Sequence, residues 1–450
     1  RGRGWHQDKW ADPPSPAVEG FPIHDALSAA VPDHPVLLTH ASGHAAIANA
    51  AALRAANVDV DAVAAAARTP DPPGGEIVRR DDGRPTGLLR ELAAGLVDAA
   101  RQRDEGPTDR ETLRRYVALA TDEVQRNGIT SFHDAGTGFG AIELLKEAAR
   151  DGTLGVRLWI MARADHDTLA ASLPVAKVRD LADGMLTVGG IKLQIDGALG
   201  ARGAWLLEPY TDAPGHFGLA LMTVEEAERV AELAVENDVQ LAIHAIGDRA
   251  NREVLDLYER VQQRHPGVRD KRWRVEHAQH LHPDDVPRFA ALGAVASMQG
   301  VHCTSDGPWV PNRLGLVRSE QGAYLWRTLV ESGALLINGT DAPVEDVDPL
   351  ASYISTVTRR MANGRAFFPA QALDRHTALA SYTRNAAEAV FELADKGTLE
   401  VGKRADIVVL SGDPLTVDDD ALDDLRVEMT ILNGQTVYRA ESSHAAPAAG

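Results

Sequence analysis

Ionisable side chains stand at or just after the ends of several short apolar runs in this 450-residue sequence. Lys192 and Asp196 lie in IKLQIDG, His244 ends the apolar run of LAIHAIGD, His277 lies in RVEHAQ, and Asp341 follows ALLINGT. Histidine and carboxylate without cysteine form the ligand set of hydrolytic zinc, manganese or iron sites. If the runs are parallel strands whose ends meet at one mouth, these side chains converge on a metal site.

Each of these residues also has a structural interpretation. A lone histidine in an apolar run is usually a hydrogen-bonded core residue, which could hold for His277, with Glu276 in a salt bridge. Lys192 could be the ion-pair partner of Asp196, and Asp341 could be a helix N-cap or an Asx-turn residue. Such roles would have to coincide at four strand ends, whereas one metal site accounts for all four together.

From about residue 107 onward, short apolar runs alternate with longer amphipathic segments. This rhythm predicts a parallel α/β sheet with helical crossovers. The seven expected strands are Ile129–Ala135, Val156–Ala162, Ile191–Gly197, Gln240–Asp248, Trp273–Gln279, Ala294–Gln299 and Ala334–Asp341. We therefore predict a (β/α)8 TIM barrel, of which one strand is missing from this sequence. An open doubly wound sheet is the alternative, but it normally has a Gly-rich phosphate loop after its first strand, and this sequence has none.

The rest of the chain predicts accessory parts around the barrel. Residues 1–106, rich in Ala, Pro and Asp, are expected to be an insertion region packed on the barrel of residues 107–397. Residues 398–440 have short strand-like runs and an Asn-Gly hairpin turn within Thr430–Tyr438, which predicts a small all-β module; the family resemblance given below implies that it is the C-terminal part of a composite β-sandwich. Residues 441–450 are expected to be a flexible tail.

The amino-acid composition limits which partners and which cellular compartment we expect for this protein. The formal net charge of −19 argues against a nucleic-acid partner, which would need a basic stripe. The single cysteine, Cys303, excludes an internal disulfide framework and a cysteine zinc cluster. No apolar run is long enough for a membrane span and no signal peptide is visible, so we expect a cytoplasmic protein that acts on a small molecule. A homodimer is the default expectation.

Several longer blocks resemble one known family. They are Pro32–Leu53, Pro73–Gly87, GITSFHDAG (Gly128–Gly136), Ile191–Tyr210, HAIGDRA, RVEHAQ, INGTDAPVEDVDP (Ile337–Pro349), SYTRNAAEA and GTLEVGKRADIVVL. On these blocks, which span nearly the whole chain, the sequence resembles the amidohydrolase superfamily. The similarity is to amidohydrolase family 3, the branch of YtcJ-type proteins and N-substituted formamide deformylases.

This resemblance implies roles for the strand-end residues. His244 and His277 would be metal ligands, and Lys192 would be carboxylated so that it bridges two ions. Asp341 would bind metal and shuttle the proton. The implied cofactor is one or two divalent ions, expected to be zinc. The implied activity is hydrolysis of a non-peptide C–N bond, in an amide or N-formyl group, by a metal-activated hydroxide, with His277 or His302 steadying the oxyanion.

Further residues at family-typical positions are expected near the substrate. These substrate-binding candidates are His44, Arg79, His133, Asp196, Arg202, Trp205 and His302.

The sequence departs from the family at its first strand. The family has a His-x-His there, and none ends a strand before Gly128; His280 and His282 have the spacing but follow the strand of His277. We therefore expect a further segment before Arg1 that carries this strand and half of the β-sandwich. Two alternatives stay open: a mononuclear aminohydrolase (a deaminase), which the state of Lys192 would distinguish, and a catalytically silent regulatory or binding barrel.

Overall fold

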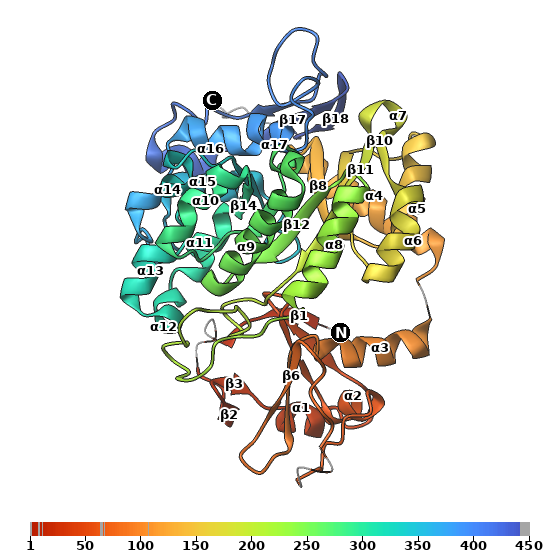
Figure 1. Ribbon diagram of the computed structural model, residues 1–450, viewed down its shortest axis with the longest axis vertical. Coiled ribbons are helices and arrows are strands. Elements are labelled where there is room, and N and C mark those ends of the chain that lie inside the picture. Colours follow the sequence, from red (N-terminus) through yellow and green to blue (C-terminus); the bar gives the residue numbers. More distant parts are fainter. Residues whose placement is uncertain are drawn as a thin grey trace, which may run out of the picture.

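A computed structural model describes residues 2–7, 10, 12–63, 66, 68–106 and 108–441. Its largest element is a curled parallel sheet of seven strands in the order β15-β14-β13-β12-β11-β9-β8, with the short β10 antiparallel to β11 (Figure 1). The strands are β8 (Ser131–Thr137), β9 (Arg157–Ala162), β10 (Val178–Asp180), β11 (Leu186–Gln194), β12 (Gln240–Ala245), β13 (Arg274–His277), β14 (Val295–Gln299) and β15 (Leu336–Gly339). Each of the seven predicted strands overlaps one of the seven parallel strands.

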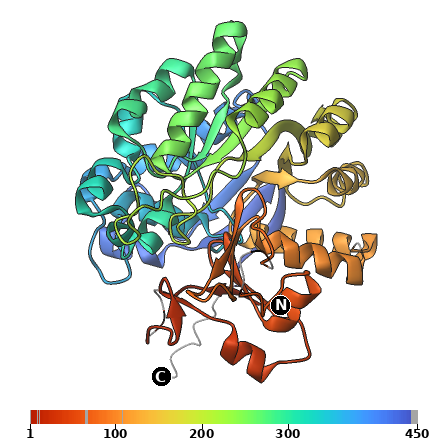
Figure 2. The ribbon, with the colours of Figure 1, turned by 60° about the horizontal axis from the view of Figure 1, so that its bottom comes forward.

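Helices cover the outer face of this sheet (Figures 1 and 2). They are α4 (Arg110–Arg126), α5 (Phe139–Arg150), α6 (His166–Ala176), α7 (Leu181–Gly184), α8 (Val224–Glu236), α9 (Asp248–Arg264), α10 (Val286–Leu292), α11 (Gly300–Asp306), α12 (Val310–Leu314), α13 (Leu316–Gly322), α14 (Trp326–Glu331), α15 (Pro349–Thr358), α16 (Arg375–Tyr382) and α17 (Arg384–Ala389). The 3-10 helices are η3 (Pro266–Lys271), η4 (Pro283–Asp285), η5 (Pro369–Gln371) and η6 (Asp419–Asp424).

Helix α8 shows how the sequence sets these crossovers. Thr223 and Glu226 form a reciprocal capping box that satisfies backbone donors at the first turn. The buried residues of α8 are Ala227, Val230, Ala231 and Ala234, which recur at helical spacing and belong to the large core between sheet and helices. The helix therefore begins at a fixed residue and buries one face.

The parallel α/β sheet is confirmed, but a closed eight-stranded barrel is not shown. Strands β8 and β15 are the two ends of the strand order, and no strand of the described residues joins them. The physical reason lies in the N-terminal residues, which pair with one another instead of adding a strand to the curled sheet.

The segment predicted as an insertion forms a unit with its own sheet, in the order β1-β4-β5-β7-β6, and a separate β2-β3 pair. Its elements are β1 (Gly2–Trp5), β2 (Ala17–Val18), β3 (Phe21–Pro22), α1 (Asp25–Ala30), β4 (Leu37–His40), β5 (Ala45–Ala48), α2 (Ala50–Ala55), β6 (Gly75–Arg79), β7 (Pro85–Glu91) and α3 (Ala94–Glu105). Leu53, Ile77 and Leu89 are buried in a separate apolar core. The sequence hid this sheet because β5 reads AAIA, and alanine has little strand preference.

The C-terminal part forms one antiparallel sheet of β16 (Ile407–Leu410), β17 (Val427–Leu432) and β18 (Gln435–Arg439). The predicted hairpin turn is confirmed: Asn433 (φ 54°) and Gly434 (φ 78°) join β17 to β18 in the left-handed conformation that a tight hairpin turn requires. The composite β-sandwich is not shown. Of the predicted flexible tail, residues 442–450 lie outside the described residues.

The two accessory units lie at opposite ends of the parallel strands (Figure 1). At the C-terminal ends, the Arg202 guanidinium, in the loop after β11, donates to the carbonyl oxygen of Glu19 at 3.0 Å. At the N-terminal ends, Arg157 at the start of β9 pairs with Asp406 at 2.6 Å, beside the C-terminal sheet. The N-terminal unit therefore stands over the strand ends where the sequence predicts chemistry, as Figure 2 shows from below.

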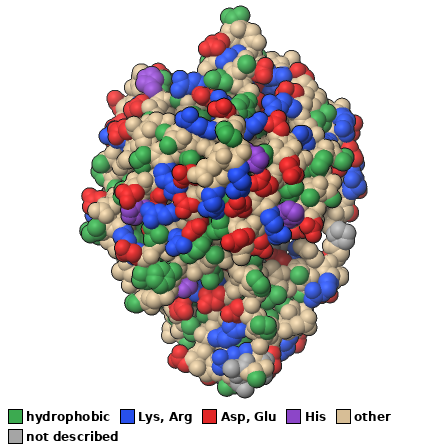
Figure 3. Space-filling model, viewed as in Figure 1, with side chains coloured by type: hydrophobic (Ala, Val, Ile, Leu, Met, Phe, Trp, Pro, Cys, Tyr) green, Lys and Arg blue, Asp and Glu red, His purple; other side chains and the backbone are tan. Residues whose placement is uncertain are grey.

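The surface carries both signs of charge. Acidic and basic side chains are mixed over the face seen in Figure 3. Among the described residues, no helix combines the length and the apolar composition needed to cross a bilayer.

Candidate metal centre

Three of the predicted site residues converge at the C-terminal ends of β13, β14 and β15. Potential ligand atoms of His277, His302 and Asp341 all lie within 4.8 Å of one another. His277 ends β13, His302 lies in the first turn of α11 after β14, and Asp341 follows β15. These three side chains are close enough to share one metal ion. His302, predicted as a substrate contact, here has the position of a ligand.

The orientation of His277 is fixed by a neighbouring strand end. Its Nδ1–H donates to Gln299 Oε1 at 2.6 Å, while the Gln299 amide nitrogen donates to the Ser297 carbonyl oxygen at 3.3 Å. With the proton on Nδ1, Nε2 of His277 keeps its lone pair. This arrangement, in which a second group holds the ring and fixes its tautomer, is typical of metal-ligating histidines.

His244 and Lys192 lie beside this cluster on β12 and β11. The rings of His244 and His277 have centroids 4.5 Å apart. Burial, together with the charges of His277 and Lys192, holds the pKa of His244 well below its usual range. Burial lowers the pKa of Lys192 to about 8, with Glu276 and Asp341 opposing that shift. The four predicted metal residues therefore share one electrostatic environment.

Backbone strain is concentrated at the same place. His277 (φ 77°), Ala278 (φ 42°) and Asp341 (φ 58°) adopt the left-handed conformation, which is uncommon for residues other than glycine. Each such residue costs about 1–3 kcal/mol unless its surroundings hold it there. At the ends of β13 and β15 these turns break the in-and-out alternation of the strands.

Of the purely structural roles predicted for these residues, the salt bridge of Glu276 is observed, whereas the capping role of Asp341 and the ion pair of Lys192 with Asp196 are not seen among the described residues. Helix α15 is capped by Asp348, and Asp341 makes no side-chain capping bond among the described residues. Lys192 donates to the Leu193 carbonyl oxygen at 3.3 Å and forms no ion pair with Asp196 in the described part of the chain. Glu276, by contrast, is in the predicted salt bridge, with Arg274 at 2.7 Å.

The Asp196 carboxylate holds the adjoining loops in place through hydrogen bonds from their backbone. It is fully buried, and its two oxygens accept from the backbone N–H groups of Trp205 (2.9 Å), Ile246 (3.0 Å) and Gly247 (2.8 Å). Burial raises its pKa to about 7, although these three donors favour the charged form. Its Oδ1 also lies 3.4 Å from His244 Nε2. The structure therefore gives Asp196, predicted as a substrate contact, a role behind His244 instead.

The N-terminal unit brings His44 to the same site. The ring of His44 lies 5.1 Å from that of His244, and its Nδ1–H donates to Glu91 Oε2 at 2.8 Å. Burial opposes protonation of His44, but Glu91 outweighs it and raises the pKa. Glu91 is buried in the left-handed conformation (φ 50°), and a Cβ on Gly197 or Gly203 would overlap its Oε1.

Sequence reasoning missed Glu91 and Gln299. Glu91 lies in an apolar stretch of the segment to which no strands had been assigned, and its role depends on a contact across two units. Gln299 ends the strand Val295–Gln299, but an amide is not a ligand type and carries no spacing signal of its own.

The other predicted substrate residues are placed differently. Arg79 pairs with Asp71 at 2.8 Å and donates to backbone oxygens of Thr69 and Ile77, so its bonds stay within its own hairpin. Arg202 pairs with Asp212 at 3.0 Å and joins the two units.

Trp205 and His133 lie on opposite sides of the cluster. The Trp205 ring lies against the Arg249 guanidinium, 5.2 Å away, in the loops over the strand ends. His133 Nδ1 accepts from Arg274 at 3.2 Å inside the sheet. The structure thus brings His44 and His302 to the cluster, and keeps His133, on β8, bonded to Arg274 inside the sheet.

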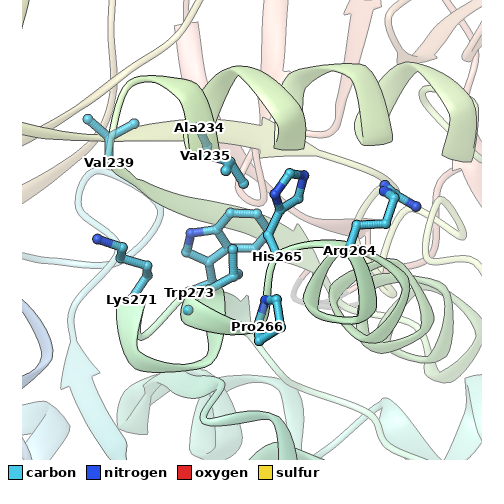
Figure 4. A pocket seen from close by; sticks show the side chains of 10 residues that line it. Ala234, Val235, Val239, Arg264, His265, Pro266, Lys271 and Trp273 are labelled. Carbon is cyan, nitrogen blue, oxygen red and sulfur yellow. The ribbon is translucent and has the colours of Figure 1, made fainter.

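A separate surface hollow of about 350 Å³ lies at the N-terminal ends of β12 and β13, away from these residues (Figure 4). Val239 and Trp273 contribute to its apolar wall, and its basic rim residues are already paired with acids: Arg264 with Glu232, and Lys271 with Asp238. The hollow therefore does not compete with the strand-end cluster as the candidate site.

The strand-end residues fit a divalent ion. Nε2 of His244 and Nε2 of His302 are buried and accept or donate no hydrogen bond among the described residues. Burial lowers the pKa of His302 as well as those of His244 and His277, so all three rings are neutral at pH 7 and keep a lone pair. Neutral imidazoles beside a carboxylate are a donor set for zinc and similar ions.

A curled parallel sheet with histidine and aspartate at its C-terminal strand ends defines the class of α/β metal-dependent hydrolases. A model of the amidohydrolase family matches residues 1–438, and the chain belongs to that family. The predicted family membership is thereby confirmed.

Relatives agree with this assignment. YtcJ of Bacillus subtilis (strain 168) is 32% identical over 97% of this chain and 79% of that protein. The N-substituted formamide deformylase of Arthrobacter pascens is 28% identical over 94% of this chain and 77% of that protein. A crystal structure of an uncharacterized metal-dependent hydrolase from Pyrococcus horikoshii OT3 has a TM-score of 0.70 and 28% identity, covering 93% of this chain and 78% of that one. Family and fold together indicate a metal-dependent hydrolase.

Proposed function

We propose that this protein hydrolyses a non-peptide C–N bond of a small molecule, in an amide or N-formyl group. The observation that carries the proposal is the convergence of His277, His302 and Asp341 within 4.8 Å, beside buried imidazole nitrogens that make no hydrogen bond among the described residues. The deformylase from Arthrobacter pascens, whose name states an N-substituted formamide substrate, supports this class of bond.

The residues that would hold the ion are Lys192, His244, His277 and Asp341, with His302 as a further donor. Zinc suits this set of nitrogen and oxygen donors. Bound there, the ion would lower the pKa of a water toward 7 and polarise the substrate carbonyl. We further propose that Lys192 becomes carboxylated, because its low pKa of about 8 leaves a share of the amine neutral, and only the neutral amine can form a carbamate.

Asp341 is proposed to move the proton. Its side chain is one-third exposed (33%), so it faces the open side of the cluster, and its Oδ2 lies 3.7 Å from His302 Nε2. Burial raises the pKa of this carboxyl, which makes it a better base than an ordinary aspartate. In this role Asp341 takes a proton from the attacking water and delivers it to the departing nitrogen.

A histidine of the N-terminal unit is proposed to stabilise the carbonyl oxygen as it becomes negative. His44 approaches the cluster from that unit with Nδ1–H committed to Glu91. A protonated His44 would present Nε2–H to the cluster as a charge-assisted donor.

The test is a panel of N-formyl and N-acyl amines, with esters and ring-amino compounds of matched size, assayed with zinc-loaded and chelator-treated protein. Release of the amine, only by the loaded protein, is the expected result. Release of ammonia from the ring-amino compounds would instead indicate an aminohydrolase. No turnover of any compound by zinc-loaded protein would contradict the proposal.

A further inference from the structure

An arginine stands at the end of β9, next to the strand that carries Lys192. Arg163 directly follows β9, and its backbone N–H donates to the Thr137 carbonyl oxygen at 3.0 Å, which fixes it beside the end of β8. Its guanidinium Nη2 donates to Gln194 Oε1 at 3.0 Å, at the end of β11. Gln194 in turn lies against His44, with its amide nitrogen 3.4 Å from Nδ1 of that ring. Arg163 is therefore at the rim of the proposed metal centre.

The charge of Arg163 has no acidic partner among the described residues. Arg249, which follows the end of β12, pairs with Glu253 at 2.6 Å, and Arg202 pairs with Asp212 at 3.0 Å. Arg163 is exposed, and in the described part of the chain it forms no ion pair and makes a single side-chain hydrogen bond, to Gln194. Most of the donors of its planar fork are therefore open to a ligand.

The backbone around Arg163 leaves room for this side chain. Gly136 adopts φ 135°, where a side chain is strained, at an irregularity in the pairing of β8 with β9. A Cβ on Gly136 would stand 3.2 Å from Cδ of Arg163, which is tighter than ordinary contact. The strand end of β8 is thus shaped to accommodate the arginine.

Arg163 is linked to the cluster through its neighbours. Gln194 accepts from its guanidinium at 3.0 Å and lies against His44, whose ring is 5.1 Å from that of His244. The chain as a whole has a formal net charge of −19, which repels anions at long range, so an anionic substrate would depend on a local cation.

We propose that Arg163 is a specificity residue that binds a carboxylate on the substrate, held in position by Gln194. The proposal rests on the hydrolase function above and narrows it: the substrate is an N-formyl or N-acyl derivative of an amine that carries a carboxylate close to the C–N bond, such as an N-acylated amino acid. A guanidinium fork binds a carboxylate through two parallel hydrogen bonds, which selects for both charge and shape.

The experiment compares pairs of compounds that differ only in this charge: N-formyl and N-acetyl derivatives of alanine and leucine, and the same compounds as primary amides. We expect wild-type zinc-loaded protein to prefer the carboxylates by about 10–100-fold in kcat/KM, from hydrogen bonds to a charged group. In Arg163→Leu the preference should fall to within about threefold, through KM, because a binding contact is lost. Arg163→Lys should be intermediate, since it keeps the charge without the fork.

The control is Arg150→Leu, an exposed arginine at the end of α5 for which the described structure shows no ion pair. It should keep the wild-type preference. Arg163→Leu should keep an unchanged melting temperature and should lose much more kcat/KM on the carboxylates than on the primary amides, which separates loss of specificity from loss of folding. An equal loss on carboxylate and amide substrates, or no preference in the wild type, would overturn the proposal.

Calorimetric binding of the same pairs keeps this proposal separate from the proposed function. If no compound is turned over, the hydrolase proposal fails, and binding decides on Arg163. Tighter binding of the carboxylate by about tenfold or more, abolished in Arg163→Leu, would support the anion site. Equal binding of carboxylate and amide, or no binding of either, would overturn it.

Discussion

Two groups of charged residues lie on the same parallel strands and differ in how far the protein satisfies them. The inner network consists of His133, Arg274, Glu276 and Ser297. Arg274 pairs with Glu276 at 2.7 Å, Ser297 donates to Glu276 at 2.7 Å, and Arg274 donates to Ser297 at 3.0 Å. The mouth cluster consists of His244, His277, His302 and Asp341 at the strand ends. There Nε2 of His244 and Nε2 of His302 make no hydrogen bond within the described residues, and the carboxylate oxygens beside them lie 3.4 Å and 3.7 Å away. In the inner network the two atoms without a hydrogen bond, Arg274 Nε and Glu276 Oε1, face each other in the ion pair at 2.7 Å.

The difference shows where chemistry can occur. A buried charge that is paired and hydrogen-bonded serves the fold, and its partners leave no atom for a ligand. A buried imidazole without a partner is unfavourable unless something else binds it, so the mouth cluster is the part of the sheet that an ion would complete. Residue type alone does not separate the two groups, since both contain histidine and a carboxylate.

The largest effect is expected from the carboxylate of the mouth cluster. Asp341→Asn removes the proposed proton carrier while keeping its size, and should lower kcat by about 10²–10⁴-fold. The melting temperature should stay close to wild type. Asp346→Asn, in the same loop but exposed, is the matched control and should retain activity. Near-normal turnover by Asp341→Asn would show that Asp341 is not the proton carrier.

Substitutions in the inner network should lower the stability of the fold. Arg274→Met leaves Glu276 buried without its partner, and we expect the free energy of unfolding to fall by about 3–5 kcal/mol in urea titrations. The double variant Arg274→Met/Glu276→Met removes both charges and should recover most of that loss. A single variant as stable as wild type would show that the network is not the buried, paired structure described above.

A smaller effect is expected from the residue that orients His277. Gln299→Ala removes the acceptor of the Nδ1–H group and should weaken zinc binding by about 10–100-fold, measured by competition with a chelator. Gln299→Glu supplies a carboxylate acceptor and should restore tight binding. If the Gln299→Ala and Gln299→Glu variants bind zinc equally well, the hydrogen bond from His277 to residue 299 does not orient the imidazole ring.

The last prediction concerns the pH dependence of stability. Burial lowers the pKa of His280 to about 3 from an ordinary value of 6.5, so the unfolded chain binds its proton more readily than the folded one. The neutral His280 ring therefore contributes fully to the free energy of unfolding above pH 6.5. This contribution is lost as the pH falls toward 3, by about 1.4 kcal/mol per pH unit at most. His280→Gln should have a shallower decline of unfolding free energy between these limits. An unchanged decline would show that His280 is not the group responsible.

Much of the parallel sheet followed from the sequence. Each of the seven predicted strands coincides with an observed one, because a buried parallel strand is a short apolar run and a crossover helix has its own spacing. Strand ends also gave His244 and His277 directly. His280, which has the His-x-His spacing with His282 but follows the strand of His277, lies against Tyr324, with ring centroids 5.5 Å apart.

The site features that could not be predicted from the sequence depend on contacts between segments that are distant along the chain. The His44–Glu91 pair joins the neighbouring strands β5 and β7 of the N-terminal sheet and meets His244 across the boundary between two units. Asp196 looked like a strand-end carboxylate open to substrate, but three backbone donors from two loops enclose it. Arg79 is at a family-typical position, yet its pairing with Asp71 is a matter of local hairpin geometry.

The central claim is that the mouth cluster binds a divalent metal, and metal content per chain tests it most directly. Elemental analysis of protein purified without chelator, combined with intact mass, should find about one to two equivalents of a divalent ion, and the mass of one added CO2 if Lys192 is carboxylated. The double variant His277→Ala/Asp341→Ala should contain almost none. Metal-free wild-type protein that also fails to take up zinc on titration would contradict the account.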